Sequence, residues 1–445
     1  MSRRMEFPDF APARLNRRSF VRSVAGTVGA LGLGARGVTA QADKVKIVWS
    51  TFGSLDELTR FTDFNTEFMT RHPNIESEFV AVPSYTEYHS KILTQLGAGQ
   101  GPDVFYVSDE YIGRFVDSGK LLDLTDLLSG PGSQSQPDDF FEGLWGGAKT
   151  PEGRIFGVTN DCNPMVLWFN KPTLAAAGIE DDPLALRDAG NWTWDAFTAM
   201  TGKLRDAGKH GAVFYNSFLN NYSLIRANGG QVYDESGKFV ASEDPKSIEA
   251  LRFIYDNIKS KNFTYANALA QGQGPDALFV SGQAGFESAG RWLLPTAKDT
   301  LPPGDYDIVT WPTTTGNTTE PGAVATSFLV INASTPHQAE AFQFLTEFVS
   351  KDGQIFRLQG GGNAVPSIKG ADDVVLEDEV PAHSQIFLDV RENGFVLPAE
   401  ETRVAGLPQD ILDGLEPLWL GTGDFDATVE SLGKMVSERL AEEAG

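Results

Sequence analysis

Two adjacent carboxylates, Asp109 and Glu110, follow a short apolar run and are the residues that come nearest to a catalytic pair. Glycoside hydrolysis uses two carboxyl groups that flank the scissile bond from opposite sides. Consecutive residues do not supply such an opposed pair. Hydrogen bonding to a ligand and a favourable negative charge at a helix N-terminus both remain open for these two side chains.

The other reactive side chains are isolated from one another. Cys162 is the single cysteine, so it forms no intramolecular disulfide, and no histidine stands next to it to activate a thiolate. The five histidines are scattered and show no zinc-binding spacing. Glycines 360–362 lack the Lys-Ser/Thr of a phosphate loop. We therefore predict no catalytic residue, no metal and no cofactor.

Aromatic residues near predicted strand ends offer a different kind of site. Flat apolar rings can cover the C–H faces of a sugar, while carboxylates and amides bind its hydroxyl groups. The residues of this kind are Trp49, Phe52, Tyr85, Trp168, Tyr215 and Trp292. Packing in a hydrophobic core is the competing interpretation for each of them.

A helix, a strand and a second helix must position the two carboxylates, Asp109 and Glu110. Tyr88, Ile92 and Leu96 recur at helical spacing before the stop signal at glycines 97 and 99. Residues 103–107 form a β-rich run typical of a strand buried on both faces of a parallel sheet. Ser108, Asp109 and Glu110 then open another helix. Polar residues at the carboxyl end of such a strand lie where open α/β sheets bind ligands.

The preceding residues predict two more strands of the same sheet, at 44–50 and 75–80, joined by a helix. The loop with Phe52 and Gly53 follows the first strand and should share a sheet edge with Asp109 and Glu110. A chain of 445 residues suggests two domains. A net charge of −24 argues against binding to nucleic acid or to an anionic membrane.

Several phrases of the sequence carry a family resemblance. They run from Lys91-Ile92-Leu93 through Gly101-Pro102-Asp103-Val104, Gly119-Lys120-Leu121-Leu122-Asp123-Leu124-Thr125, Asn170-Lys171 and Thr193-Trp194-Asp195 to Gly282-Gln283-Ala284-Gly285-Phe286-Glu287-Ser288-Ala289-Gly290-Arg291-Trp292. This text resembles the extracellular solute-binding proteins that supply ABC importers with sugars and glycerol-phosphate-type solutes. Asn191-Trp192 replaces the proline that the family places before Thr193.

The resemblance implies a type II-like two-lobed α/β binding protein with discontinuous lobes joined by hinge crossovers. We expect residues 43–156 and 287–329 in one lobe, residues 160–284 and 332–445 in the other, and crossovers near 158–161, 284–288 and 327–331. The family's first crossover corresponds to Asn160 and Asp161, and the second to Ser288, Arg291 and Trp292, with Trp292 in its Gly-x-Trp position.

Function follows from the same resemblance. We expect a monomer that carries a carbohydrate or polyol to permease subunits of an ABC importer. Mono- or oligosaccharides are favoured over phosphorylated solutes because only Arg291, and in second place Arg357, is available for an anion. An exported carbohydrate-active enzyme, glycosidase-like, and a ligand-binding receptor for signalling are the alternatives.

Residues 1–40 read as a twin-arginine signal peptide. Arg17 and Arg18 precede a Gly/Ala-rich apolar run and the small residues 38–40, and cleavage after Ala40 or Ala42 is left open. No cysteine lies near this site, so no lipid anchor is expected. The sequence thus predicts export to the periplasm by the twin-arginine route.

Overall fold

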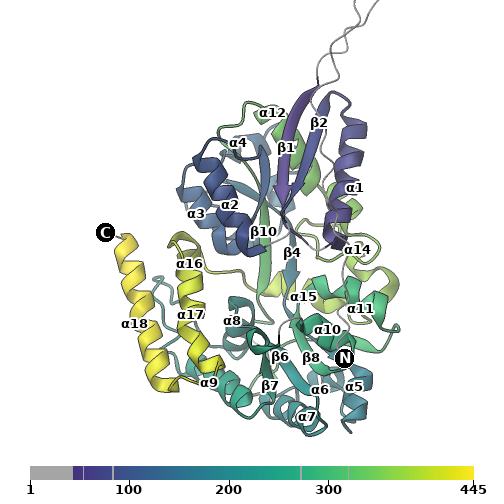
Figure 1. Cartoon of the computed structure of the whole chain (residues 1–445), viewed down its shortest axis with the longest axis vertical. Coiled ribbons are helices and arrows are strands. Elements are labelled where there is room, and N and C mark those ends of the chain that lie inside the picture. Colours follow the sequence, from purple (N-terminus) through teal and green to yellow (C-terminus); the bar gives the residue numbers. More distant parts are fainter. Residues whose placement is uncertain (1–43, 54, 83–84, 271–272, 319, 445) are drawn as a thin grey trace, which may run out of the picture. The chain divides into compact units, whose positions relative to one another are not determined.

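A computed structural model describes residues 44–444, apart from residues 54, 83–84, 271–272 and 319 (Figure 1). The predicted signal peptide at 1–40 lies outside the described residues. The described chain is organised around two five-stranded sheets, each of which is the centre of one lobe. The expected two-lobed α/β fold is thereby confirmed.

The first lobe contains the sheet of order β2-β1-β3-β10-β4. β1 is parallel to β2 and β3, whereas β10 is antiparallel to β3 and β4. The elements of this lobe are β1 (Val45–Thr51), α1 (Leu55–Arg71), β2 (Ile75–Ala81), α2 (Tyr85–Gly97), β3 (Val104–Ser108), α3 (Asp109–Asp117), α4 (Thr125–Leu128), η1 (Pro137–Asp139), η2 (Glu142–Leu144), η3 (Gly146–Ala148), β4 (Gly157–Pro164), β10 (Val324–Ile331), α12 (Gln338–Val349) and α13 (Lys351–Leu358).

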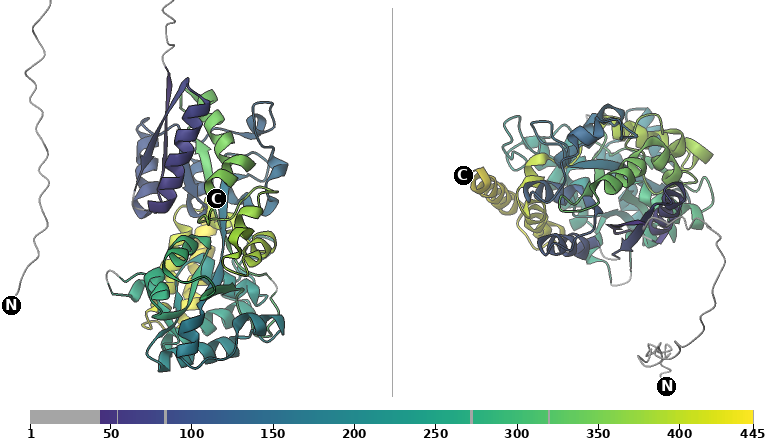
Figure 2. Two further views of the ribbon diagram at one scale, coloured as in Figure 1. Left: turned by 90° about the vertical axis from the view of Figure 1, so that its right-hand side faces the viewer. Right: turned by 90° about the horizontal axis from the view of Figure 1, so that it is seen from above.

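The second lobe contains the sheet of order β7-β6-β8-β5-β9, in which β6 is parallel to β7 and β8. Its elements are β5 (Val166–Asn170), α5 (Lys171–Ala176), α6 (Pro183–Asp188), α7 (Trp194–Asp206), β6 (His210–Phe214), α8 (Phe218–Ala227), α9 (Pro245–Lys259), β7 (Phe263–Tyr265), η4 (Ala266–Ala268), α10 (Pro275–Val280), β8 (Ala284–Ala289), η5 (Arg291–Leu293), α11 (Leu294–Thr300), β9 (Tyr306–Val309), α14 (Asp373–Leu376), η6 (Glu377–Glu379), α15 (Gln385–Asn393), α17 (Leu407–Trp419) and α18 (Phe425–Ala444). α17 and α18 lie side by side in both views (Figures 1 and 2).

The strand registers show which edge of each sheet meets the chain crossings. β4 ends at Pro164 and β5 begins at Val166, so the chain passes between the lobes there. Val166 pairs with Ala289, the last residue of β8, which places the carboxyl ends of β6 and β8 at the crossing side. Ser108, the last residue of β3, pairs with Ser327 near the start of β10. The carboxyl ends of β3 in one lobe and of β6 and β8 in the other therefore point toward the crossings.

The expected lobe boundaries differ from the strand pairing. Residues 287–329 were expected in the first lobe, but β8 and β9 both pair with β5 in the second sheet, so the expected crossover at 284–288 is wrong. α12 and α13 belong to the first lobe rather than the second, because Phe344 and Phe348 of α12 pack on the ring of Trp49. Local sequence pattern predicts a strand but does not show which sheet the strand joins.

A short helix, α16 (Ala399–Arg403), connects the two lobes once more near the C-terminus. It packs on α3 so closely that a Cβ atom at Gly113 would lie 2.2 Å from the carbonyl oxygen of Thr402. Glu401, which also lies in α16, accepts a hydrogen bond of 2.6 Å from the Tyr222 hydroxyl on α8. Burial raises the pKa of Glu401 to about 7. α16 is thus held by side chains of both lobes.

Within the part of the chain that the structure describes, every helix is either too short or too polar to cross a bilayer.

Candidate functional site

A cluster of aromatic rings occupies the crossing-side edge of the first lobe. Phe52 follows β1 and lies partly exposed, with its ring centroid 5.3 Å from Tyr88 and 5.4 Å from Tyr106. The Tyr106 hydroxyl is hydrogen bonded to the Ser327 hydroxyl of β10. Gly53 follows Phe52 and is also half-buried. A ring that is fixed by neighbours and remains partly accessible can stack on an apolar ligand face.

The two adjacent carboxylates lie beside this cluster but differ in their surroundings. Asp109 is buried and accepts hydrogen bonds from the backbone N–H of Thr326 at 3.0 Å and of Glu110 at 2.9 Å. Burial, helped by the charge of Glu110, raises the pKa of Asp109 to about 8. The side chain of Glu110 is partly exposed. Asp109 therefore joins α3 to β10, while Glu110 remains the more accessible acceptor.

Asn160 and Asp161 lie on β4 at the crossing and are both buried. Arg357 of α13 donates one hydrogen bond of 3.0 Å to the Asp161 carboxylate and one of 2.8 Å to the Asn160 carbonyl oxygen. Burial raises the pKa of Asp161, and the nearby Arg357 guanidinium opposes that rise. Since Arg357 is itself 1% exposed, its charge is committed to Asp161 and does not face a ligand.

Trp292 lies on the second lobe next to the crossing strand β4. It is partly buried in η5, and its ring folds back over Gly290, where a Cβ atom would lie 2.4 Å from the ring. The same Cβ would lie 2.8 Å from Asn163 of β4. The Arg291 N–H donates to the Asn163 side chain at 2.9 Å. The glycine of this Gly-x-Trp phrase is needed because the ring and the crossing strand occupy the space of a side chain.

The Arg291 side chain does not serve the expected role. It is 0% exposed and donates to the carbonyl oxygens of Gly362 at 2.6 Å, Ala364 at 3.0 Å and Val374 at 3.0 Å. Burial lowers its pKa to about 10. The expected ligand contact is corrected to a structural role, in which the guanidinium holds the chain after α13 against η5.

Two of the predicted tryptophans are also corrected to core positions. Trp49 is 0% exposed, stacks on Phe79 with ring centroids 4.3 Å apart, and donates to the Asn65 side chain. Trp168 is 0% exposed and packs 5.9 Å from both Tyr306 and Phe387. Both strands are covered on both faces, so a large residue near the strand end points into the core rather than toward a ligand.

The remaining predicted residues divide by accessibility. Tyr215 follows β6 at the crossing-side edge and is partly exposed. Ser288 on β8 is 1% exposed. Tyr85 begins α2, and its side chain is outside the described part of the structure. Phe52, Gly53, Glu110, Tyr215 and Trp292 thus stay as predicted contacts on accessible positions, and Asp109, Asn160, Asp161 and Ser288 stay as predictions on buried ones.

The sequence analysis missed a pair of carboxyl groups at the same edge of the second lobe. Glu287 lies within β8 and is 0% exposed, while Asp276 lies half-buried in the first turn of α10. Burial first, and then Asp276, raises the pKa of Glu287 well above its usual value. A single charged residue inside the otherwise small and apolar run of β8 was the signal that could have identified it.

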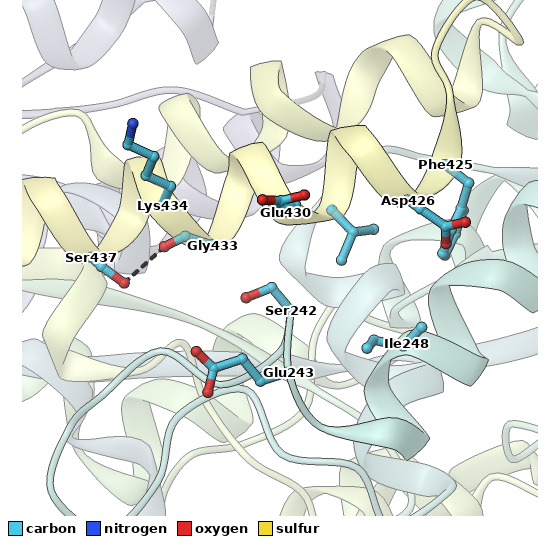
Figure 3. Close-up of a pocket in the computed structure, with 10 residues that line it drawn as sticks. Ser242, Glu243, Ile248, Phe425, Asp426, Glu430, Gly433, Lys434 and Ser437 are labelled. Atoms are coloured by element: carbon cyan, nitrogen blue, oxygen red, sulfur yellow. Dashed lines mark hydrogen bonds between the residues drawn. The ribbon is translucent and has the colours of Figure 1, made fainter.

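A separate groove lies between the loop at 242–243 and α18, far along the chain from these edges. It has a volume of about 380 Å³, and Figure 3 shows Ser242 and Glu243 facing Gly433 and Glu430 of α18. The acidic residues Glu243 and Asp426 in its lining are paired with Lys238 and Arg252. This groove contains none of the residues predicted for a ligand site.

The two crossing-side edges together have a recognisable chemistry. Each carries a partly exposed aromatic ring, Phe52 in one lobe and Trp292 in the other, and each carries carboxyl groups. Both arginines proposed for anion binding are bound to protein groups. Stacking faces next to hydrogen-bond acceptors are suited to solutes that present C–H surfaces and hydrogen-bond donors.

Comparison with known proteins gives relatives of the same kind. The chain is 21% identical over 258 residues to a maltotriose-binding protein of Pyrococcus abyssi, a match that covers 57% of this chain and 51% of the relative. It is 23% identical over 317 residues, covering 68% of this chain and 65% of the relative, to an uncharacterized lipoprotein encoded in the oleD 5' region of Streptomyces antibioticus. The chain thus spans about half to two thirds of the length of these relatives.

Solved structures match over most of the chain. An ABC substrate-binding protein of Listeria monocytogenes in complex with cycloalternan has a TM-score of 0.78 at 18% identity, over 90% of this chain and 100% of that one. Maltose-bound MalE3 of T. maritima has a TM-score of 0.73 at 22% identity, over 88% and 99%. At these identities the likeness shows the two-lobed fold alone.

The sequence model of the family described as bacterial extracellular solute-binding protein matches residues 53–355. That range includes the strands of both sheets except β1, together with Glu110, Tyr215 and Trp292 of the crossing-side edges, whereas Phe52 lies one residue before it. The chain belongs to the family of bacterial extracellular solute-binding proteins.

Proposed function

We propose that the protein captures a sugar or related polyol between its two lobes and delivers it to the permease subunits of an ABC importer. The observation that carries this proposal is the placement of Phe52 and Trp292 on two edges that both point toward the chain crossings. Rings on opposite lobes can enclose a saccharide when the lobes close. Relatives whose names or titles state maltotriose, maltose or cycloalternan as ligand support the sugar class.

The charge distribution supports a solute that is not an anion. UgpB of Mycobacterium tuberculosis, solved with glycerophosphocholine, has a similar fold with a TM-score of 0.74. In the present chain, Arg291 and Arg357 donate to protein carbonyl and carboxylate groups, and a phosphate would have to compete with those bonds. The acidic residues nearby would repel it.

A ligand panel tests the proposal. We expect maltose, maltotriose or another neutral saccharide to raise the melting temperature and to bind in calorimetry, because ligands that bind only the folded state stabilise it. Glycerol 3-phosphate serves as the anionic control, and glycerophosphocholine serves as a zwitterionic phosphodiester control. Tight binding of a phosphorylated solute alone would contradict the sugar assignment.

We propose that the lobes close on the ligand. Small-angle scattering should then give a smaller radius of gyration at saturating ligand than without it, since the ligand has higher affinity for the closed state. An unchanged radius would contradict hinge closure. The same data give the molecular mass, which we expect to be that of a monomer.

We propose that the protein binds its solute without chemical change. Incubation with the bound saccharide should return it intact, whereas an exported carbohydrate-active enzyme would release shorter products. Chromatography of the solute after prolonged incubation distinguishes the two.

We propose export to the periplasm by the twin-arginine route. Replacing Arg17 and Arg18 together with lysine should leave the unprocessed precursor in the cytoplasm. Normal export of that double variant would contradict the route.

A further inference from the structure

Glu287 is the most unusual buried group in the described chain. Its side chain is 0% exposed, and neither carboxyl oxygen accepts a hydrogen bond from any described residue. Burial of a carboxyl group without a donor is strongly unfavourable. A methionine of similar size would avoid that cost. A group kept at such a cost is a candidate for a function that needs its charge or its acceptor atoms.

Asp276 is carried by α10, which packs against the strand β8 that carries Glu287, and the charge of Asp276 contributes to the raised pKa of Glu287. Two carboxylates are both acceptors, so they form a bond only when they share a proton. The raised pKa of Glu287, caused first by burial and second by Asp276, agrees with such sharing. The pair then holds one proton and one negative charge. Burial first, and then the charges of Glu287 and Asp276, raises the pKa of Tyr215, so its hydroxyl stays neutral.

The pair lies at the edge where a solute would sit. Asp276 is in the first turn of α10, which leads directly into β8, so it lies near the carboxyl end of that strand. Tyr215 follows the last residue of the parallel strand β6. Glu287 is two residues from Ala289, which pairs with Val166 at the chain crossing. Asp276 and Tyr215 are both partly exposed, so the buried Glu287 lies behind two accessible groups.

A metal ion is a poor match for this pair. Among the described residues, no group of three or more histidine, cysteine, aspartate or glutamate side chains is arranged to hold a metal. An organic cation needs fewer ligands. A protonated amine offers three N–H donors in one compact group, which matches acceptors that have no donor of their own.

We propose that Asp276 and Glu287 bind a positively charged amino group of the solute, with the Tyr215 hydroxyl beside them. The inference deepens the proposed function, because it adds a basic nitrogen to a saccharide or polyol held between the lobes. The ammonium group takes the place of the shared proton, donates to both carboxylates, and the proton is released to solvent. Charge is balanced, since one positive charge replaces another.

The test compares solutes that differ only in this group. Glucosamine, galactosamine and the amino derivative of the best neutral saccharide are titrated against the mature chain beside their hydroxyl parents and their N-acetyl forms. We expect the amines to bind at least tenfold more tightly than both partners. Titration in two buffers of different ionisation enthalpy should show release of about one proton per amine bound.

Variants separate the pair from general effects on the fold. Glu287→Gln and Asp276→Asn should each weaken amine binding by about thirtyfold or more, as expected when one partner of a buried charged contact is lost. In both variants the preference for the amine over its neutral parent should be lost. Glu180→Gln, at an exposed position of the same lobe, is the matched control. Glu287→Gln should keep a urea midpoint close to that of the wild type in the absence of solute, because the glutamine amide can still donate a hydrogen bond to Asp276.

The experiments distinguish failure of the amine site from failure of the proposed function. If neutral saccharides bind and their amines bind no better, or if the two variants leave amine affinity unchanged, the amine site is wrong and the proposed function stands. If no saccharide binds, charged or neutral, both the proposed function and the amine site are contradicted. Binding of amines without release of a proton would overturn the shared-proton state of the pair.

Discussion

Arg357 of α13 and Asp161 of β4 form a buried ion pair with a nitrogen–oxygen distance of 3.0 Å. The pair joins α13, the second helix after β10 in the chain, to the strand that leads into the second lobe. The guanidinium also lies over the Phe348 ring, 4.0 Å from its centroid. Arg357, which the sequence suggested for anion binding, thus stabilises β4 close to the point where the chain passes into the second lobe.

The pair can be tested by removing one partner. Arg357→Leu should lower the free energy of unfolding by about 3–5 kcal/mol, because Asp161 is left as a buried charge without its cation. Urea denaturation followed by circular dichroism measures the change. Arg187→Leu, which breaks an exposed contact with Asp188, should cost less than about 1 kcal/mol. Equal effects of the two substitutions would contradict the structural role of the Arg357 pair.

Asp109 should make stability depend on pH. Its pKa of about 8 exceeds the value of the unfolded chain, so the folded state binds the extra proton and its stability falls as the pH rises from about 4 to 8. Asp109→Asn removes that dependence but also loses one of two backbone hydrogen bonds. The variant should therefore be less stable than wild type near pH 4. As the pH rises, its free energy of unfolding should increase relative to that of the wild type by up to about 1.4 kcal/mol per pH unit. Urea midpoints at pH 4, 6 and 8 measure this difference.

The exposed Asp181→Asn is the control for that series and should follow the wild type at every pH. A difference between Asp109→Asn and wild type that stays constant from pH 4 to pH 8 would show that Asp109 is ionised throughout.

Trp292 should contribute a large share of the binding energy. Trp292→Ala should weaken affinity for the best saccharide by about 1–3 kcal/mol, the range for loss of a large aromatic contact. Phe356→Ala removes a ring that is 38% exposed on α13 and should leave affinity unchanged. Calorimetry on both variants decides the matter, and unchanged affinity in the Trp292 variant would remove it from the site.

Gly290 should be intolerant of any side chain. In Gly290→Ala the new methyl group would lie 2.4 Å from the Trp292 ring and 2.8 Å from Asn163, so the ring must shift. We expect a loss of about 1–3 kcal/mol in stability, typical of overpacking, together with weaker binding. Gly97→Ala places its methyl group in open space and is the matched control. Similar melting temperatures for the two alanine variants would contradict the close contact.

Local pattern predicted the elements well. The strand expected at 75–80 is β2 with one residue added, and the strand expected at 103–107 is β3 shifted by one residue. Amphipathic spacing and glycine stops are local, so sequence alone identifies them. The lobe of β8 was wrong because strand pairing depends on residues far away in the chain, here Val166 to Phe169 of β5.

The candidate site was predicted less well, for a physical reason. A residue near the end of a buried strand points to one of two covered faces or to the sheet edge, and its type does not distinguish them. Trp49 and Phe52 stand three residues apart, yet the first is 0% exposed and the second is partly exposed. Arg291 and Glu287 show the same difficulty: the arginine donates to three backbone carbonyls, and the carboxyl oxygens of the overlooked glutamate accept no hydrogen bond from the described residues.

The position of β10 has a consequence for the order of folding. It lies between β3 and β4 in the first sheet, although almost 160 residues separate it from the end of β4 along the chain. The first lobe therefore cannot complete its sheet until the strands of the second lobe have been synthesised. Contacts between such distant segments slow folding, because a long loop must close before the contact forms. During synthesis, β3 and β4 should therefore keep exposed edges until β10 has been made and can pair with both of them.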